Sequence, residues 1–493
     1  MSAPLQALSP LDLTLADPDA TARFAEVVAE LVRPGDVLAL SGDLGAGKTS
    51  FARALINAIC REPVEVPSPT FTLVQSYETP KGVLWHFDLY RIRQPEEAYE
   101  LGIEEAFATG ISVIEWPGRL GLLLPEGALH LDFAQAAGSD ARRVRVGADS
   151  AFAERLPALA SGVARMTAMT RFLDEAGWGA AVRRPLAGDA SFRRYFRLTG
   201  ESDTAVLMDA PPPFEDVRPF VAIAGWLGAQ DYSAPRVRAA DSAAGFLLLE
   251  DLGDGLYGRL LASGQDASAL YGAAVDLLAD LHRRAPPGGL DMQDVPRLLD
   301  ELALIPDWYL PALTGRPCPA AVRAEYQAAW QAALAELPPF SPVLVLRDYF
   351  ADNLLWLPGR SGLARVGLLD FQDAILGHPA YDLVSLLHDA RRDLPPALCA
   401  DLLQRYIAAS GVEAEAFRTA CALLGAQRNA RIAGLWPRLW RRDNKPQYLA
   451  FLPRTFALLE RDLAHPRLAR VRAWFDREIP PALRRQKLPG APR

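Results

Sequence analysis

Two groups of residues in this sequence have the types and spacing of sites that bind phosphate and a divalent cation. The first is a glycine-rich loop with the pattern G-x-x-x-x-G-K-T. Its glycines allow backbone N–H groups to surround phosphate oxygens, its lysine reaches the outer phosphates, and its threonine hydroxyl binds Mg²⁺. The residues of the loop are Gly42, Asp43, Leu44, Gly45, Ala46, Gly47, Lys48 and Thr49. The pattern therefore predicts a P-loop that binds ATP and Mg²⁺.

The residues around this loop fit a P-loop. Residues 37–40 are a short apolar run typical of a buried strand, and residues 50–60 have the pattern of a helix. A P-loop also needs a carboxylate at the end of a neighbouring strand to hold the metal. Glu115, which ends the apolar run 111–114, is the first candidate, and Asp88 is the second.

The second group of residues has the spacing of a kinase catalytic loop. Asp348 is followed at position i+5 by Asn353, and a further apolar run ends at Asp370. In such a loop the first aspartate accepts the proton of the substrate hydroxyl, while the asparagine and the second aspartate bind Mg²⁺. We therefore expect Asp348 to be catalytic and Asn353 and Asp370 to be metal ligands.

Other residues occur where a kinase-like domain would need them. Gly188 and Ser191 lie in a turn that we expect to cover the ATP phosphates, between two predicted strands. Glu250 and Leu252 follow an apolar strand pattern and are predicted to form the hinge that binds adenine. Asp382 is predicted to brace the catalytic loop by accepting hydrogen bonds from its backbone.

Length and composition limit the other possibilities. At 493 residues the chain is too long for one core, so two to four domains are expected. The net charge of −8 argues against strong direct binding of nucleic acid, which needs a basic face. The four cysteines form no C-x-x-C pair, which indicates a reducing compartment. With no signal peptide or apolar run of membrane-spanning length, we expect a cytoplasmic protein that does not bind membranes.

The predicted elements change along the chain. Strands and helices alternate through residues 1–160, which predicts an α/β P-loop NTPase domain with a mainly parallel sheet. The pattern fades over residues 134–165. Residues 161–493 carry a predicted helix at 170–176, then four strand-like segments at 182–186, 195–198, 205–208 and 245–249, and become mostly helical from residue 268. This order predicts a bilobal α+β domain of the protein-kinase-like type.

Four motifs of the first part resemble one family. They are residues 42–49, SPTF at 68–71, HFDLYR at 86–91 and EWP at 115–117. In this order they are similar to the bacterial TsaE family, ATPase subunits of the machinery that makes threonylcarbamoyladenosine in tRNA. The resemblance implies ATP hydrolysis that serves a complex of protein partners. It also implies that Thr49 and Glu115 hold Mg²⁺, that Asp88 and Lys48 support catalysis, that Ser68–Thr70 sense the nucleotide, and that Trp116 lies beside the site.

Motifs of the second part resemble the aminoglycoside phosphotransferase family. They are LAGDASFRRYFRL at 186–198, LMDAPP at 207–212, RDYFADNLLWL at 347–357, LDFQDA at 369–374 and GHPAYDL at 377–383. Within that family they are most similar to AmgK-type kinases. The resemblance implies phosphorylation of N-acetylmuramate and N-acetylglucosamine at the anomeric hydroxyl, for cell-wall sugar recycling. Candidate sugar contacts are Glu301, Trp308 and Tyr309.

The sequence departs from the wider kinase pattern at two positions. Leu346 stands where the catalytic loop often carries histidine, and Met208 stands where a strand lysine would bind phosphate. The phosphates must then be positioned by Mg²⁺ or by an arginine, for which the candidates are Arg193, Arg194 and Arg197.

Two alternatives stay open for the second domain. It is either a non-catalytic module that regulates the ATPase, or a kinase for another acceptor such as an aminoglycoside, an amino alcohol or a different sugar. An acidic acceptor pocket would favour a cationic substrate, and a more neutral polar pocket would favour N-acetyl sugars.

Overall fold

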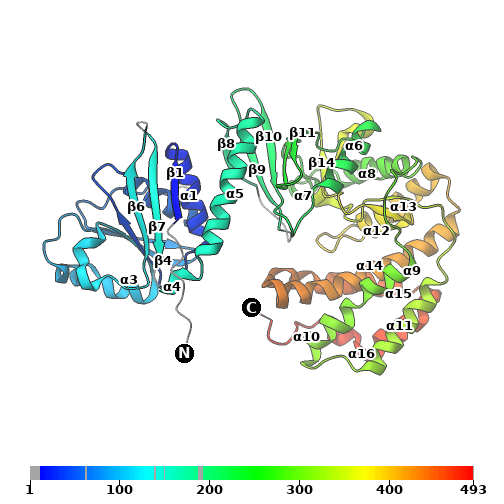
Figure 1. Cartoon of the computed structure of the whole chain (residues 1–493). Coiled ribbons are helices and arrows are strands. Elements are labelled where there is room, and N and C mark those ends of the chain that lie inside the picture. The colour runs from blue at the N-terminus through cyan, green and yellow to red at the C-terminus, as the bar shows by residue number, and fades with distance from the viewer. Residues whose placement is uncertain (1–10, 61–63, 138–139, 149, 187–191, 492–493) are drawn as a thin grey trace. The chain divides into compact units, whose positions relative to one another are not determined.

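The computed structural model describes residues 11–60, 64–137, 140–148, 150–186 and 192–491 (Figure 1). The chain divides into two units, Met1–Gly179 and Ala180–Arg493. Among the described residues, the buried apolar side chains form separate clusters in the two units. The boundary expected near residue 160 falls inside α5 (Leu156–Glu175), a helix of the first unit.

A mixed sheet forms the centre of the first unit. Its order among the described residues is β1-β7-β6-β2-β5-β4-β3. The strands are β1 (Leu11–Leu15), β2 (Val37–Ser41), β3 (Val74–Thr79), β4 (Gly82–Asp88), β5 (Ile111–Glu115), β6 (Leu129–Gln135) and β7 (Arg142–Ala148). The pairs β6–β2, β2–β5 and β5–β4 are parallel, whereas β1–β7, β7–β6 and β4–β3 are antiparallel. The expectation of a mainly parallel sheet therefore holds at the centre of the sheet and is wrong at its edges.

The central strands are the ones that the sequence indicated most clearly. The first four residues of β2 and all of β5 are buried, as expected of strands covered on both faces. The strands β1 and β7 alternate between buried and exposed positions and carry several charged residues, so their sequence signal is weak. This explains why the pattern faded after residue 134.

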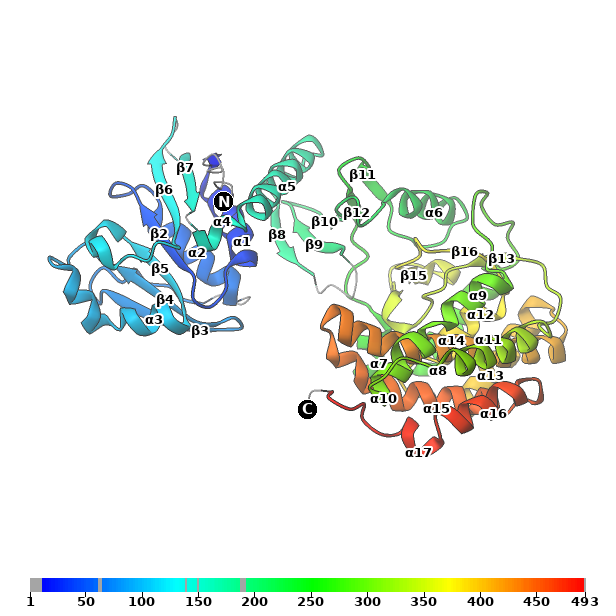
Figure 2. The ribbon, with the colours of Figure 1, turned by 60° about the horizontal axis from the view of Figure 1, so that its bottom comes forward.

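Helices cover the sheet of the first unit. They are α1 (Pro18–Leu31), α2 (Lys48–Cys60), α3 (Ile103–Thr109), α4 (Ser150–Ala153) and α5. The Asp17 side chain caps α1 by accepting a hydrogen bond of 2.6 Å from the backbone N–H of Ala20. Figures 1 and 2 show α5 running beside α1, where Leu159 and Val163 are buried. The helix predicted at residues 170–176 is the last part of this longer α5.

The second unit begins with a five-stranded antiparallel sheet in the order β11-β12-β10-β9-β8. The strands are β8 (Val182–Pro185), β9 (Arg194–Thr199), β10 (Thr204–Asp209), β11 (Val237–Asp241) and β12 (Phe246–Glu250), and α6 (Arg218–Ala229) lies between β10 and β11 in the sequence. The sequence indicated four of these strands. It missed β11, in which burial is only partial throughout.

A larger, mostly helical part follows. Its helices are α7 (Tyr257–Ala262), α8 (Ala267–Leu281), α9 (Val295–Leu302), α10 (Leu310–Thr314), α11 (Ala320–Leu334), α12 (Ala380–Leu387), α13 (Pro396–Ser410), α14 (Ala414–Asp443), α15 (Leu452–Leu463), α16 (Ala469–Glu478) and α17 (Pro481–Arg484). Two short antiparallel pairs join β13 (Val343–Val345) to β16 (Ile375–Gly377) and β14 (Leu354–Trp356) to β15 (Val366–Leu368). This order gives the small β-rich lobe and larger helical lobe that the sequence predicted.

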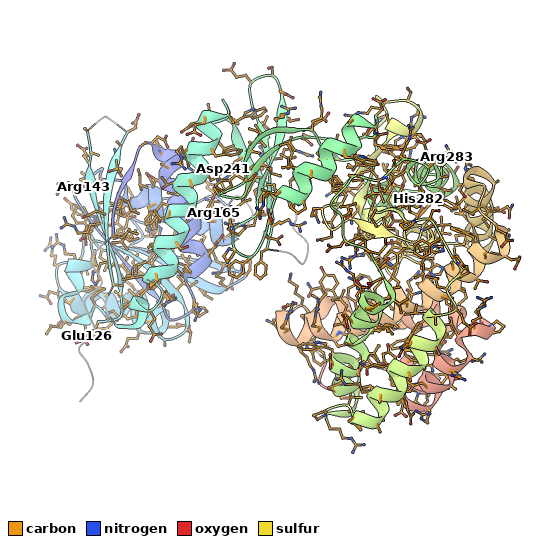
Figure 3. All side chains as sticks on the ribbon, turned by 45° about the vertical axis from the view of Figure 1, so that its right-hand side comes forward. Glu126, Arg143, Arg165, Asp241, His282 and Arg283 are labelled. Atoms are coloured by element: carbon orange, nitrogen blue, oxygen red, sulfur yellow. The ribbon has the colours of Figure 1, made fainter. Side chains whose placement is uncertain are left out.

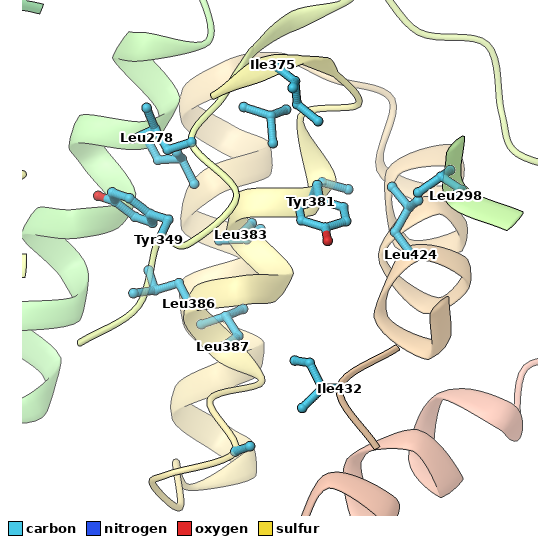
Figure 4. Packing of buried hydrophobic residues seen from close by; sticks show 14 of the residues in the cluster. Leu278, Leu298, Tyr349, Ile375, Tyr381, Leu383, Leu386, Leu387, Leu424 and Ile432 are labelled. Carbon is cyan, nitrogen blue, oxygen red and sulfur yellow. The ribbon is translucent and has the colours of Figure 1, made fainter. Parts of the chain in front are cut away.

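The core of the helical lobe fixes the segments around the catalytic loop. Figure 4 shows Tyr381 of α12 facing Leu424 of α14, and Tyr349 beside Leu278 of α8. None of the described helices is long and apolar enough to cross a membrane.

One ion pair ties the start of α5 to the first core. The Arg155 guanidinium donates hydrogen bonds of 2.6 and 2.5 Å to the two carboxylate oxygens of Asp36, and a third bond of 2.8 Å to the carbonyl of Leu31. We expect Arg155→Ala to destabilise the first unit by about 1–3 kcal/mol, because the largely buried Asp36 carboxylate loses both guanidinium bonds, keeping the N–H of Arg33, and the Leu31 carbonyl loses its bond to Arg155. Calorimetry of the full chain should show a lower melting temperature for one transition.

The matched control is Arg145→Ala. Arg145 pairs with Asp12, but both side chains are more than half exposed. Exposed pairs contribute little, so this variant should melt like the wild-type chain. Equal melting of the Arg155 and Arg145 variants would contradict the role assigned to Arg155.

Candidate functional site

The P-loop lies between β2 and α2, at the carboxyl end of the central strand of the first sheet. Its backbone requires glycine. Gly42 has φ +133°, and a Cβ atom there would lie 2.2 Å from the carbonyl oxygen of Phe133. Gly45 and Gly47 also have positive φ angles, of 77° and 108°. Substitution at Gly42 would therefore displace the loop from β6.

The Lys48 ammonium group is held inside the loop. It donates hydrogen bonds of 2.8 Å to the carbonyl oxygens of Gly42 and Asp43, and lies 4.1 Å from the centre of the Trp116 ring. Burial lowers the pKa of Lys48, and the carboxylates of Glu115, Asp88 and Asp43 partly offset this effect. A cation at this position is well placed to meet the outer phosphates of a bound nucleotide.

Thr49, in the first turn of α2, meets Glu115 at the carboxyl end of β5. The Thr49 hydroxyl donates a hydrogen bond of 2.8 Å to Glu115 Oε2, and His86 Nε2 lies 3.0 Å from Glu115 Oε1. Both Glu115 and His86 are almost completely buried. A hydroxyl and a carboxylate oxygen side by side are ligands that suit Mg²⁺.

His86 is a site residue that the sequence analysis missed. Its imidazole orients Glu115, the candidate metal ligand, as second partners of metal ligands commonly do. A signal was present in the strand pattern, because side chains at positions 86 and 88 of β4 point to the same face of the sheet. That pattern places His86 on the same face as Asp88.

Asp88 is connected to the segment expected to sense the nucleotide. The Thr70 hydroxyl donates a hydrogen bond of 2.6 Å to Asp88 Oδ2, and Ser68 Oγ lies 2.8 Å from Thr70 Oγ1. Asp88 is also the register partner of Glu115 in the parallel pair β4–β5. The structure thus brings together all the residues expected at the first site.

The second site forms around the loop between β13 and β14. The Asn353 amide donates hydrogen bonds of 2.9 Å to the carbonyl of Asp348 and 3.3 Å to Asp370 Oδ2. Arg347 and Asp370 have positive φ angles of 69° and 57°, which non-glycine residues adopt only when their surroundings require it. The three residues expected at the kinase site are therefore close together.

Asp370 carries the clearest electrostatic signal of this site. Burial raises the pKa of Asp370, and the Asp348 carboxylate raises it further, while a 2.8 Å hydrogen bond from the Gln372 amide acts in the opposite direction. Two carboxylates so close together repel each other unless a cation lies near them. The donor set of Asp370 and Asn353 therefore fits a divalent cation.

Asp382 holds the catalytic loop in place. Its buried carboxylate accepts hydrogen bonds of 2.6 and 2.8 Å from the backbone N–H groups of Leu346 and Arg347. This confirms the bracing role expected for Asp382. His282, labelled in Figure 3 at the end of α8, lies 3.9 Å from the same carboxylate and 2.7 Å from the Tyr406 hydroxyl.

Of the three candidate arginines, the structure places Arg193 at the site. The Arg193 guanidinium lies 2.9 Å from Glu215 and 3.3 Å from Asp370. By contrast, Arg194 pairs with the buried Asp209. Arg197 pairs with two acids at the end of the β-rich lobe, Asp251 and Asp254. Met208 is buried in the core of the unit, so its side chain does not reach the site.

The expected adenine and phosphate contacts are less complete. Gly188 and Ser191 lie outside the described residues. Glu250 ends β12, where its side chain accepts hydrogen bonds from Arg236 and Arg360 and its backbone N–H donates one of 2.8 Å to the carbonyl of Arg236. Leu252 lies two residues further on, in the connection between β12 and α7.

The candidate sugar contacts separate into different environments. Glu301 lies beside the catalytic loop, because Arg347 donates a hydrogen bond of 2.7 Å to it. Tyr309 is buried in the helical core against Phe456 and does not reach the site. Trp308 is half-buried on the same segment.

Comparison with known proteins separates the two halves in the same way. The family model for the threonylcarbamoyl adenosine biosynthesis protein TsaE matches residues 15–144, and that of the phosphotransferase enzyme family matches residues 182–419. An N-acetylmuramate/N-acetylglucosamine kinase of Caulobacter vibrioides is 42% identical over 358 residues, covering 65% of this chain and 98% of that protein.

The first half has curated relatives of its own. A tRNA threonylcarbamoyladenosine biosynthesis protein TsaE of Rickettsia bellii is 44% identical over 112 residues, which is 23% of this chain and 78% of that protein.

Among solved structures, the chain resembles a choline/ethanolamine kinase family protein from Mesorhizobium loti. The two are 17% identical, the match covers 63% of this chain and 98% of that chain, and the TM-score is 0.45.

Each relative is covered over most of its own length by a different part of the chain, and each match contains the residues that form one of the two sites. The chain therefore belongs to two families, to the TsaE family through its first half and to the phosphotransferase family of N-acetylmuramate/N-acetylglucosamine kinases through its second.

Proposed function

We propose that the chain is a bifunctional enzyme with two independent ATP sites. The first hydrolyses ATP in support of tRNA threonylcarbamoyladenosine synthesis. The second transfers phosphate from ATP to the anomeric hydroxyl of N-acetylmuramate or N-acetylglucosamine. The observation that carries the kinase assignment is the hydrogen-bonded set Asp348, Asn353 and Asp370. The chain that holds this set is 42% identical to such a kinase, and the match covers 98% of that kinase.

At the first site the protein positions the phosphates rather than reacting with them. The backbone of residues 42–47 surrounds the phosphates, and Lys48 neutralises their charge. Thr49 and Glu115 would hold Mg²⁺, with His86 fixing the orientation of Glu115. Asp88 accepts a hydrogen bond from Thr70, so a change in the nucleotide would reach the segment Ser68–Thr70 directly.

Protein partners fit this first activity. The residues Leu44 and Phe71 beside the P-loop are 82% and 86% exposed, although both are large and apolar. Such residues are commonly covered by a partner. We propose subunits of the threonylcarbamoyl-transfer complex as the partners and the cytoplasm, where tRNA is modified, as the location.

At the second site Asp348 accepts the proton of the attacking sugar hydroxyl. Asn353 and Asp370 would hold Mg²⁺, which would offset the negative charge of the phosphates. The carboxylate of Asp382 keeps the loop rigid, so that Asp348 stays aligned with the acceptor.

Arg193 would bind the ATP phosphates in place of the lysine that kinases commonly carry on a strand of the β-rich lobe. In kinases a lysine paired with a glutamate binds the ATP phosphates. Here the Arg193–Glu215 ion pair ends beside Asp370, while Met208 is buried. A cation paired with an acid next to a metal ligand supports a phosphate-binding role for Arg193.

The alternatives are less well supported. A non-catalytic second unit would not need Asp348, Asn353 and Asp370 held together, with positive φ angles at Asp370 and at Arg347 beside Asp348. An aminoglycoside acceptor is cationic, whereas two arginines, Arg347 and Arg431, contact Glu301 beside the catalytic loop.

The two activities should be separable by single substitutions. Asp348→Asn removes the proton acceptor and should lower sugar phosphorylation at least about 100-fold. Direct detection of the sugar phosphate by mass spectrometry avoids interference from ATP hydrolysis at the first site. Undiminished sugar phosphate from this variant would refute the catalytic role of Asp348.

Lys48→Ala provides the reciprocal test. It should abolish one of two ATP-binding events per chain in calorimetric titration and leave sugar phosphorylation unchanged, because Lys48 serves only the first site. A wild-type titration with a single nucleotide per chain would be incompatible with the two-site assignment.

Arg193→Met should raise the KM for ATP and lower kcat/KM for ATP about 100-fold, since it removes a cation from the phosphates. Arg193→Lys should recover part of the loss. Arg218→Gln is the matched control. Arg218, at the start of α6, is highly exposed and pairs with Asp216, the residue after the Glu215 that Arg193 contacts. ATP kinetics in the Arg193→Met variant that matched this control would exclude Arg193 from phosphate binding.

A further inference from the structure

A cluster of polar side chains joins α14 to the catalytic loop. Glu301 accepts a hydrogen bond of 2.7 Å from Arg347, the residue before Asp348. Glu301 also lies 3.7 Å from the Arg431 guanidinium and accepts a bond of 3.3 Å from the Gln427 amide. The position of this part of α14 beside the catalytic loop is therefore fixed by Glu301.

Arg428 belongs to the same side of the helix. Successive residues of an α-helix are separated by about 100°. Viewed along the axis of α14, Arg431 therefore lies between Gln427 and Arg428, and the three side chains span about 100° of the helix surface. Burial lowers the pKa of Arg428, while Tyr381 and then Asp348 act in the opposite direction, which places both groups within electrostatic range of its guanidinium.

Arg428 has no partner for most of its donors. It is 5% exposed, and its Nε and Nη1 atoms are buried without a hydrogen-bond partner among the described residues. Nearby acids are already engaged, because Glu301 contacts Arg347 and Arg431, and Asp389 pairs with Arg392. A buried guanidinium left without partners is costly, so its presence calls for an anionic group from outside the chain.

Other unpaired polar atoms occur around the same place. Gln427 Oε1 and Arg347 Nε are also buried without a partner among the described residues, and the Tyr381 hydroxyl lies within reach of the Arg431 guanidinium. Figure 4 shows the Tyr381 ring facing the part of α14 that carries Leu424. Arg347 directly precedes Asp348, and a polar ligand beside Asp348 would give these buried atoms partners. Arg431, whose side chain is 23% exposed, connects the cluster to solvent.

We propose that Arg428 and Arg431 form an anion subsite that binds the carboxylate of an acidic acceptor sugar beside Asp348. This inference rests on the proposed kinase function and deepens it. N-acetylmuramate carries a lactyl carboxylate that N-acetylglucosamine lacks. The Asp348 carboxylate would repel that group, and two guanidinium groups on α14 offset the repulsion and bind it through paired N–H···O bonds.

The subsite makes a prediction about the ratio of two specificity constants. The ratio is kcat/KM for N-acetylmuramate divided by kcat/KM for N-acetylglucosamine, measured with the full chain. Arg428→Gln and Arg431→Gln should each lower this ratio about tenfold to a hundredfold, the range for losing a charged hydrogen-bond partner. The loss should appear mainly as a higher KM for N-acetylmuramate, and Arg428→Lys should restore part of the ratio.

Arg442→Gln is the matched control on the same helix. Arg442 is more than half exposed and pairs with the adjacent Asp443, so the ratio should not change. A second measurement needs no substitution. For the wild-type chain, kcat/KM should be lower for the analogue whose lactyl carboxylate is replaced by a neutral amide than for N-acetylmuramate. The size of this loss should equal the loss of kcat/KM that Arg428→Gln causes with N-acetylmuramate.

The outcomes are distinguishable. A parallel loss for both sugars in a folded Arg428→Gln variant, or an amide used as well as the acid, would overturn the subsite and leave the kinase assignment intact. A wild-type chain that phosphorylated neither sugar would overturn the proposed function and the subsite with it.

Discussion

Each of the two sites depends on a buried carboxylate whose oxygens are held by other groups. Glu115 accepts a hydrogen bond from Thr49 and lies against His86, which fixes one candidate metal ligand next to the P-loop. Asp382 accepts the backbone N–H groups of Leu346 and Arg347, which fixes the position of the next residue, Asp348. A buried acid without such partners would be strongly destabilising, so the surrounding strands and helices must keep these contacts in place.

We propose that Arg193 replaces the strand lysine with which kinases commonly bind the ATP phosphates. Met208 occupies the position of the phosphate-binding lysine and contributes to the core instead. Arg193 precedes β9, a neighbouring strand of the same sheet, and its ion pair with Glu215 ends at Asp370. A guanidinium with several donors can reach the phosphates from this different backbone position.

The acceptor side adds a second electrostatic feature. An acidic pocket would favour a cationic substrate, but Arg347 and Arg431 contact Glu301 beside the catalytic loop, and Arg428 is a further buried arginine on α14. Cations beside a catalytic aspartate favour an acceptor that carries its own negative charge. The proposed function, the electrostatics and the unpaired buried atoms all point to an acidic sugar.

The sequence alone determined the two halves, the P-loop, the catalytic loop and the central strands β2 and β5, because each has a local pattern of spacing or hydrophobicity. It did not reveal His86, the strands β1 and β7 on one side of the first sheet, or the choice of Arg193 among three neighbouring arginines. It also gave no sign that Arg428 lies near Asp348. These features arise from contacts between segments distant in sequence, and only the tertiary structure decides which side chains become buried together and which buried charges remain without a partner.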